Sequence, residues 1–284
     1  MYAHIYKQIP MGGHASYGAA WSAYILPQIE QQNLFDTLFF QESGVGQWAH
    51  PFPGMPRELL PVLRPNIIAC ETVVPTFRCP SAPNAEHLWN RSQNDGWVVE
   101  RRVPANYIGN ASGLWTNQEI FTISEPVRGR GGEFKYHLLD ADGVMFPNSR
   151  VRQADITDGL SNTILIGEAV GEDHSFPPNK ELVGTKDHWA IGGDDPDVDK
   201  DWSEFHGSTA VPMNMFNQSD VPDWLLAIDS RATSELSFGS KHPGGSQFVR
   251  CDGSVFFLSE SVDLQTYSAM GTRDRGEVFQ DPTQ

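Results

Sequence analysis

Apolar residues at helical spacing are concentrated in the first forty residues of the chain. Within residues 16–40, the side chains that share one helical face are Trp21, Tyr24, Ile25, Ile29, Leu34, Phe35 and Leu38. This periodicity predicts an amphipathic helix that packs against the body of the protein. Pro27 predicts a kink in it, because proline lacks a backbone N–H and clashes with the preceding turn.

Residues 1–15 carry a shorter version of the same pattern. Its apolar positions are Tyr2, Ile5, Tyr6 and Ile9. The pattern stops at Pro10 and the glycines that follow it. An amphipathic stretch that begins abruptly after Met1 is typical of the end of a longer helix. We therefore expect residues 1–15 to be the remnant of an N-terminal helix whose start is missing.

After Phe40 the pattern changes to short apolar runs separated by proline, glycine and asparagine. Such runs are typical of short strands joined by long loops. Residues 163–168 form one predicted strand, preceded by a turn at Asp158-Gly159. Residues 246–250 and 255–259 flank Asp252-Gly253 and predict a hairpin. The predicted turn is of type I′, in which both central residues need φ > 0.

The composition narrows the choice of partners. The formal net charge of -16 argues against binding to nucleic acid or an anionic membrane surface, because both are polyanions. A bound cation fits this charge better. No apolar window reaches the ~18 residues of a membrane helix, and no signal peptide is visible. We expect a single domain over residues 1–284, since neither a linker nor a repeat interrupts the chain.

The three cysteines are Cys70, Cys79 and Cys251, so at most one disulfide can form. Cys70 and Cys79 are close enough in sequence to close a short loop, which a location in the cell envelope would permit. The alternative is three buried thiols, because cysteine is among the most buried residue types. The sequence leaves both states open.

Several segments resemble, in order, those of the family with a prepilin-type N-terminus and a DUF1559 domain. They are YILPQIEQQNLFD at 24–36, VVPTFRCPS at 73–81, ANYIGN at 105–110, DGVMFPNSR at 142–150, DITDGLSNT at 155–163 with Gly167-Glu168 after it, and FGSKHPGGSQFVRCDGSVFF at 238–257. The first resembles the family's LLPYIEQQNLYD, and the last its SRHPGGANFLFADGSVRF. Cys251 departs from this pattern, because the family usually has alanine there.

The resemblance implies a pilin-like subunit of a type II secretion or type IV pilin-like pseudopilus. It implies an α+β pseudopilin-like fold, in which a truncated N-terminal helix packs on an antiparallel sheet with long loop insertions. Other pseudopilin subunits would bind through the missing helix, which would also anchor the protein in the inner membrane with its body facing the periplasm or exterior. Without that helix we expect a soluble monomer.

An acidic run near residue 197 is a candidate cation site. Its alternating carboxylates are Asp195, Asp197, Asp199 and Asp201. Such carboxylates can converge on Ca²⁺, which prefers oxygen ligands, whereas zinc prefers nitrogen and sulfur. The match to an EF-hand loop is poor, because Lys200 stands where that loop has glycine and His206 where it has glutamate. The alternative is a solvated acidic loop.

His242, Asp252 and Glu168 are the candidate groups for acid–base catalysis, if they meet in a cleft. Asp252 has an alternative role in the predicted β-turn, and His242 could simply bond to backbone. No Gly-x-Ser-x-Gly or His-Glu-x-x-His motif occurs. A Ca²⁺-dependent hydrolase of esters or lactones on a pilin-like scaffold therefore remains the first alternative function.

A glycan-binding module is the second alternative function. The tryptophans in loop-like, polar surroundings include Trp48, Trp89, Trp97, Trp115, Trp189 and Trp202. An exposed indole ring can stack on a sugar or on a partner protein.

Overall fold

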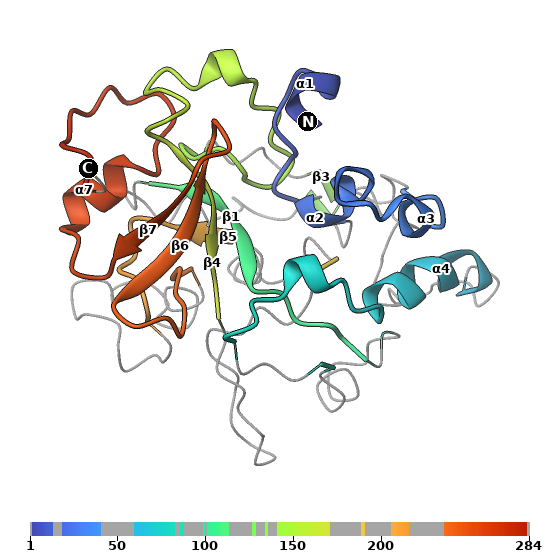
Figure 1. The fold of residues 1–284 in the computed structure, drawn as a ribbon. Coiled ribbons are helices and arrows are strands. Elements are labelled where there is room, and N and C mark those ends of the chain that lie inside the picture. The colour runs from blue at the N-terminus through green and yellow to red at the C-terminus, as the bar shows by residue number, and fades with distance from the viewer. Residues whose placement is uncertain are drawn as a thin grey trace.

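The structure is a computed structural model of the whole chain. The residues it describes are 2–13, 19–40, 60–82, 86–87, 99, 101–113, 127–128, 134–135, 141–170, 189–190, 206–215 and 236–282. They form a five-stranded sheet with short helices on either side (Figure 1). The fold class is α+β, as the sequence predicts.

The main sheet has the strand order β5-β1-β4-β6-β7. Its strands are β1 (Tyr107–Ser112), β4 (Ile164–Glu168), β5 (His206–Ser208), β6 (Gly245–Arg250) and β7 (Val255–Ser259). Three pairings are antiparallel, but β5 runs parallel to β1. The sheet is therefore mixed, whereas the sequence predicted an antiparallel sheet. The parallel pairing joins β1 to a strand far away in the sequence, and no local pattern predicts such a pairing. A separate two-stranded sheet pairs β2 (Val127–Arg128) with β3 (Phe134–Lys135).

The helices are short. The α-helices are α1 (Tyr2–Tyr6), α2 (Trp21–Tyr24), α3 (Gln32–Phe35), α4 (Leu60–Cys70) and α7 (Leu264–Ala269). The 3₁₀-helices are η1 (Leu26–Ile29), η3 (Pro75–Phe77) and η5 (Gln153–Asp155). Within the described ranges, no helix is both long enough and apolar enough to cross a membrane.

The long helix predicted for residues 16–40 is wrong in its continuity. The described part of this segment is divided into α2, η1 and α3. Pro27 does not kink one helix but lies in the first turn of the separate helix η1. That helix ends at Glu30, whose φ of 63° is left-handed and stops helical propagation. The apolar face was correctly identified, because its side chains still pack on one hydrophobic cluster.

The helix predicted near the N-terminus is present as α1, which ends where Lys7 adopts a φ of 61°. None of its residues is fully buried, but Ala3 packs against the hydrophobic cluster around Trp21. The helix lies at the rim of the molecule (Figure 1). The chain enters the body only after α1, where the buried Ile9 donates its backbone N–H to the Val151 carbonyl at 2.8 Å.

Two hydrophobic clusters lie on the two faces of the main sheet. Neighbouring residues of β1 belong to different clusters, because alternate side chains of a strand point to opposite faces. Tyr107 packs on the cluster around Trp21 and Phe77, while Ile108 belongs to the cluster around Phe248. Helix α7 covers the second cluster with Tyr267, whose side chain is fully buried.

The predicted C-terminal hairpin is confirmed as β6 and β7. The type I′ turn is wrong, because Gly253 has a φ of 90° whereas Asp252 is not among the described residues with positive φ. The Gly253 N–H donates to the Arg250 carbonyl at 2.9 Å, and the Arg250 N–H to the Ser254 carbonyl at 2.9 Å. This is a three-residue loop with a glycine bulge. The strand predicted at 163–168 is also confirmed, as β4.

Candidate functional site

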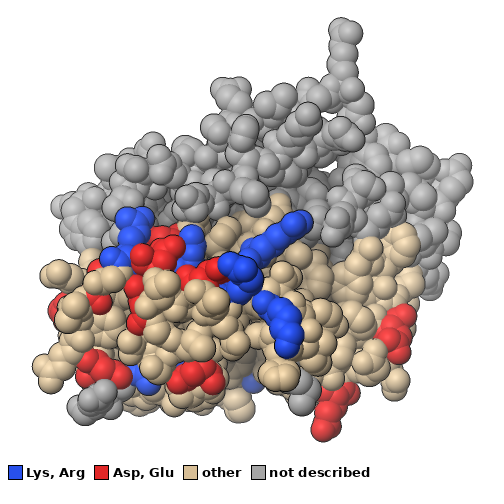
Figure 2. All heavy atoms as spheres, turned by 90° about the horizontal axis from the view of Figure 1, so that it is seen from above, with Lys and Arg blue, Asp and Glu red and all other residues tan. Residues whose placement is uncertain are grey.

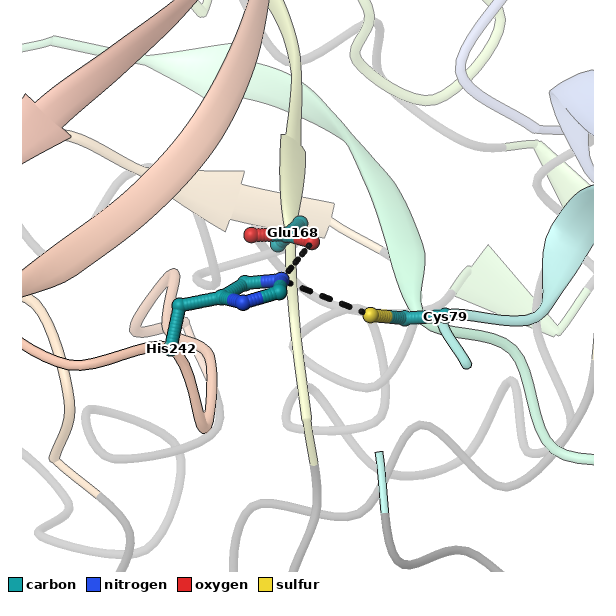
Figure 3. Close-up of side chains that lie close together, drawn as sticks. All are labelled: Cys79, Glu168 and His242. Atoms are coloured by element: carbon teal, nitrogen blue, oxygen red, sulfur yellow. Dashed lines mark hydrogen bonds and ion pairs between the residues drawn. The ribbon is translucent and has the colours of Figure 1, made fainter. Parts of the chain in front are cut away.

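Three side chains from segments far apart in the sequence converge at one end of the main sheet (Figure 3). His242 Nε2 lies 3.3 Å from Glu168 Oε1 and 3.7 Å from Cys79 Sγ. The three potential ligand atoms all lie within 4.8 Å of one another. This cluster is the only group of three or more such side chains found among the described residues.

Glu168 is held by the backbone on two sides. It is the last residue of β4 and only 2% exposed. Its carbonyl accepts the Gly239 N–H at 2.8 Å, and its Oε2 accepts the Gln247 N–H at 2.7 Å. These bonds fix the carboxylate so that Oε1 faces His242 (Figure 3).

Cys79 follows η3 and is buried beside the sheet. Its backbone N–H donates to Asn106 Oδ1 at 2.9 Å, which ties the cysteine to the residue preceding β1. Burial raises the pKa of the Cys79 thiol, and the neighbouring Glu168 carboxylate raises it further. The thiol is therefore not activated by its protein surroundings alone, since a nucleophilic cysteine normally has a lowered pKa.

His242 belongs to the loop that leads into β6, and its side chain is 32% exposed. The loop is braced by Ser240, whose hydroxyl accepts the His242 N–H at 3.0 Å and donates to the Gly245 carbonyl at 2.7 Å. Gly244 has a φ of 82°, which explains a glycine in this turn. His242 is thus the member of the cluster that solvent reaches most easily.

Tyr107 borders the cluster. It pairs with Glu168 across β1 and β4, and its side chain is half-buried. Burial raises the pKa of the Tyr107 phenol to about 12, and the nearby Cys79 and Glu168 contribute to this rise. The phenol is therefore protonated at neutral pH and available as a hydrogen-bond donor.

The structure brings together two of the three residues proposed for acid–base chemistry, His242 and Glu168. Asp252 does not join them, because it lies in the turn after β6, at the end of that strand remote from His242. Its carboxylate accepts the Ser254 N–H at 2.8 Å and hydroxyl at 2.6 Å. Asp252 therefore has the turn role that the sequence offered as its alternative.

Sequence reasoning missed Cys79 as a site residue. The sequence left open a bridge between Cys70 and Cys79 or three buried thiols, and the second is confirmed, because all three cysteines are free and buried. Cys79 and His242 are 163 positions apart in the chain, so no motif spacing links them. The available signal was that each member lies in a segment that resembles the family.

Other sequence candidates lie outside the described residues or inside the core. The acidic run with Asp195, Asp197, Asp199 and Asp201 lies outside the described residues, as do Trp48, Trp89, Trp97, Trp115 and Trp202. Trp189 is buried, stacks on Phe77 and donates its indole N–H to the Thr72 carbonyl at 2.9 Å. This tryptophan is therefore part of the scaffold and is not placed to bind a sugar.

Comparison with known proteins gives one family. The model of a family described as a protein of unknown function, DUF1559, matches residues 1–265. No curated protein and no solved structure matches the chain. The match covers all three members of the cluster.

Proposed function

Because this chain belongs to the DUF1559 family, we propose that it is the outward-facing body of a pseudopilin-like subunit in the bacterial cell envelope. The observation that carries this proposal is the ordered set of segments, from residue 24 to residue 257, that resemble family members with a prepilin-type N-terminus. A pilin-like fold and a role in a type II secretion or type IV pilin-like pseudopilus belong to the same proposal. The role is structural, and the partners are other subunits.

Helix α1 supports an interaction role. An amphipathic helix normally buries its apolar face, yet α1 leaves Ile5 56% and Tyr6 51% exposed. Exposed apolar side chains that are neighbours on a helix suit contact with another protein surface. In this proposal the exposed side chains of α1 contact neighbouring subunits.

The charge of the surface fits protein partners better than nucleic acid. The net charge is -16, and Figure 2 shows acidic and basic side chains intermixed on the face seen there rather than one continuous basic patch. Two arginines of the described residues are paired with carboxylates, Arg275 with Asp142 and Arg250 with Asp281. A nucleic-acid partner would need clustered, available cations.

Site-specific photo-crosslinking tests the envelope role. A photoreactive phenylalanine analogue would replace Tyr6 in the full-length protein, expressed in the bacterium that encodes it. The expected result is crosslinks to membrane-fraction subunits of the pilin type. Val278, which is 99% exposed, provides the control position. Equal crosslinking from both positions, or recovery of the full-length protein only from the cytosol, would contradict the proposal.

The pairing of His242 with Glu168 favours a hydrolase as a second candidate function. A histidine oriented by a buried carboxylate is a common arrangement for general-base catalysis. The test is hydrolysis of a panel of esters and lactones by the purified chain, with Glu168→Gln and with Glu86→Gln, which changes an exposed glutamate. Activity that Glu168→Gln abolishes and Glu86→Gln retains supports a hydrolase. Absence of activity on the whole panel with and without divalent metal ions would oppose it.

A further inference from the structure

The geometry points to a metal site: Cys79, Glu168 and His242 bind a divalent transition-metal ion, preferentially zinc, with one coordination position left open. This inference rests on the donor atoms alone and holds whether or not the protein assembles into an envelope structure. The Ca²⁺ expected at the acidic run is a separate matter, because its ligands would be different residues.

The two donor separations that involve His242 match a tetrahedral zinc site. Zinc bonds of ~2.3 Å to sulfur, ~2.0–2.1 Å to nitrogen and ~2.0–2.2 Å to oxygen imply tetrahedral separations of about 3.3 Å between nitrogen and oxygen and about 3.6 Å between nitrogen and sulfur. The observed separations are 3.3 Å for His242 Nε2 to Glu168 Oε1 and 3.7 Å for His242 Nε2 to Cys79 Sγ. Two of the three separations therefore already suit the ion, and the third, between Cys79 Sγ and Glu168 Oε1, is within 4.8 Å.

The orientation of His242 distinguishes a metal site from a cysteine-based catalytic triad. In a triad, one imidazole nitrogen faces the nucleophile and the other faces the carboxylate. Here Nε2 alone faces both Cys79 Sγ and Glu168 Oε1 (Figure 3). One nitrogen cannot hold both partners in the way a proton relay requires. Three donor atoms directed at a common point are instead the arrangement that a shared cation needs.

The types of donor select the metal. Thiolate and imidazole are ligands of zinc and other late transition metals, whereas Ca²⁺ and Mg²⁺ prefer oxygen ligands. A single carboxylate oxygen beside sulfur and nitrogen is compatible with zinc and insufficient for calcium. Zinc does not change its oxidation state, so a zinc ion at this site needs no electron donor or acceptor.

Outer hydrogen bonds hold the ligands in position, as they commonly do around metal ions. Glu168 Oε2 is occupied by the Gln247 N–H, which leaves Oε1 for the metal. The backbone of Cys79 is fixed by Asn106, and the loop of His242 by Ser240. The Glu168 carboxylate and the backbones of Cys79 and His242 are thus held in place before any metal binds.

The described residues supply three donors, whereas tetrahedral zinc takes four ligands. Zinc sites with three protein ligands keep the fourth position for water or substrate, whereas structural sites are closed by protein. His242 provides a solvent-facing side to the cluster, since it is 32% exposed while Glu168 is 2% exposed. The fourth ligand is therefore a water molecule, which a small oxygen-donor ligand such as a carboxylate can replace.

Metal binding to the EDTA-treated full-length chain tests the site. Zn²⁺ would be titrated against a chromophoric chelator, and Co²⁺ would be added separately to record a thiolate-to-cobalt charge-transfer band. The account predicts one equivalent of metal and a cobalt spectrum typical of tetrahedral coordination. Calcium should not compete. A binding stoichiometry of zero, or a cobalt spectrum without the thiolate band, would overturn the inference.

Variants assign the ligands. Cys79→Ser should abolish the charge-transfer band, and His242→Gln and Glu168→Gln should each weaken zinc binding more than tenfold. Cys251→Ala removes a different buried thiol and should retain both band and affinity. Circular dichroism checks that each variant is folded; His242, which is partly exposed, is the substitution that the fold tolerates best. If folded His242→Gln binds zinc as tightly as the unchanged protein, the inference is wrong, and the crosslinking result for the envelope role stands unaffected.

Discussion

Tyr107 and Glu168 lie directly opposite one another on the antiparallel strands β1 and β4. Opposite residues of such a pair project from the same face of the sheet, with Cβ atoms ~4.5–5.5 Å apart. The sheet itself therefore places the phenol next to the carboxylate, and the segments that carry Cys79 and His242 add the other two groups. A site built on strands is held more precisely than one built on loops alone.

Tyr107→Phe should leave zinc binding nearly intact. The phenol is not one of the three metal ligands, so only a hydrogen bond is removed while the ring remains. One neutral hydrogen bond contributes about 0.5–1.5 kcal/mol, so the Kd for zinc should change by at most about tenfold. The chelator titration measures this change. A loss of zinc affinity much greater than tenfold in Tyr107→Phe would show that the phenol takes part in binding and that the proposed ligand set is incomplete.

Gly253→Val should destabilise the C-terminal hairpin. Gly253 has a φ of 90°, and a Cβ at this position would meet nothing within 4 Å. The cost is therefore backbone strain rather than a clash, about 1–2 kcal/mol for a left-handed residue. Gly253→Asn is the matched control, because asparagine adopts positive φ more readily. Urea denaturation should give a lower midpoint for valine than for asparagine; equal midpoints would contradict the turn geometry.

The sequence predicted the hairpin and β4 well, because both depend on local turn chemistry and alternating side chains. The predicted turn type was wrong. The loop around Asp252 has three residues, whereas a type I′ hairpin turn has two. The prediction also failed for the helix over residues 16–40, where Glu30 adopts a left-handed conformation that no propensity scale favours. The parallel pairing of β5 is set by tertiary contacts that sequence periodicity does not record.

The candidate site was only partly predictable for the same reason. Glu168 and His242 were predicted as acid–base groups, and the antiparallel pairing of β4 with β6 brings their segments together. Cys79 comes from a separate segment and reaches them only through tertiary folding. Asp252 was adjacent to the same motif in sequence, but strand β6 separates it from His242.

Asp155→Asn should lower stability at neutral pH and not near pH 2. The Arg152 side chain hydrogen-bonds the carboxylate at 3.0 and 2.6 Å and holds the pKa of Asp155 at about 2, against about 3.9 when unfolded. A lowered folded pKa stabilises the protein above the unfolded pKa, and this contribution is lost as pH falls through the folded pKa.

The measurement is the difference in Tm between the unchanged protein and Asp155→Asn across this pH range. Both side chains are accessible to solvent, so the difference should be small and should shrink in high salt. A difference in Tm that persists unchanged at pH 2 would contradict the assignment.

The calcium site expected at the acidic run stays a prediction. Without a counterion, the carboxylates of Asp195, Asp197, Asp199 and Asp201 repel one another over a short stretch of chain. Calcium at ~100 times its Kd should add about 2.7 kcal/mol to the free energy of unfolding. The thermal melt is best recorded on His242→Gln, so that the zinc cluster does not contribute. Equal shifts with matched NaCl would indicate a solvated acidic loop.

The most direct test of the central claim is an anomalous diffraction measurement on crystals of the full-length chain soaked in zinc. Data collected on both sides of the zinc absorption edge locate the ion without any assumption about its ligands. The account predicts one strong anomalous peak, ~2.0–2.3 Å from Cys79 Sγ, His242 Nε2 and Glu168 Oε1, with a water molecule completing the tetrahedron. Absence of a peak at these three atoms, with zinc bound elsewhere or not at all, would contradict it.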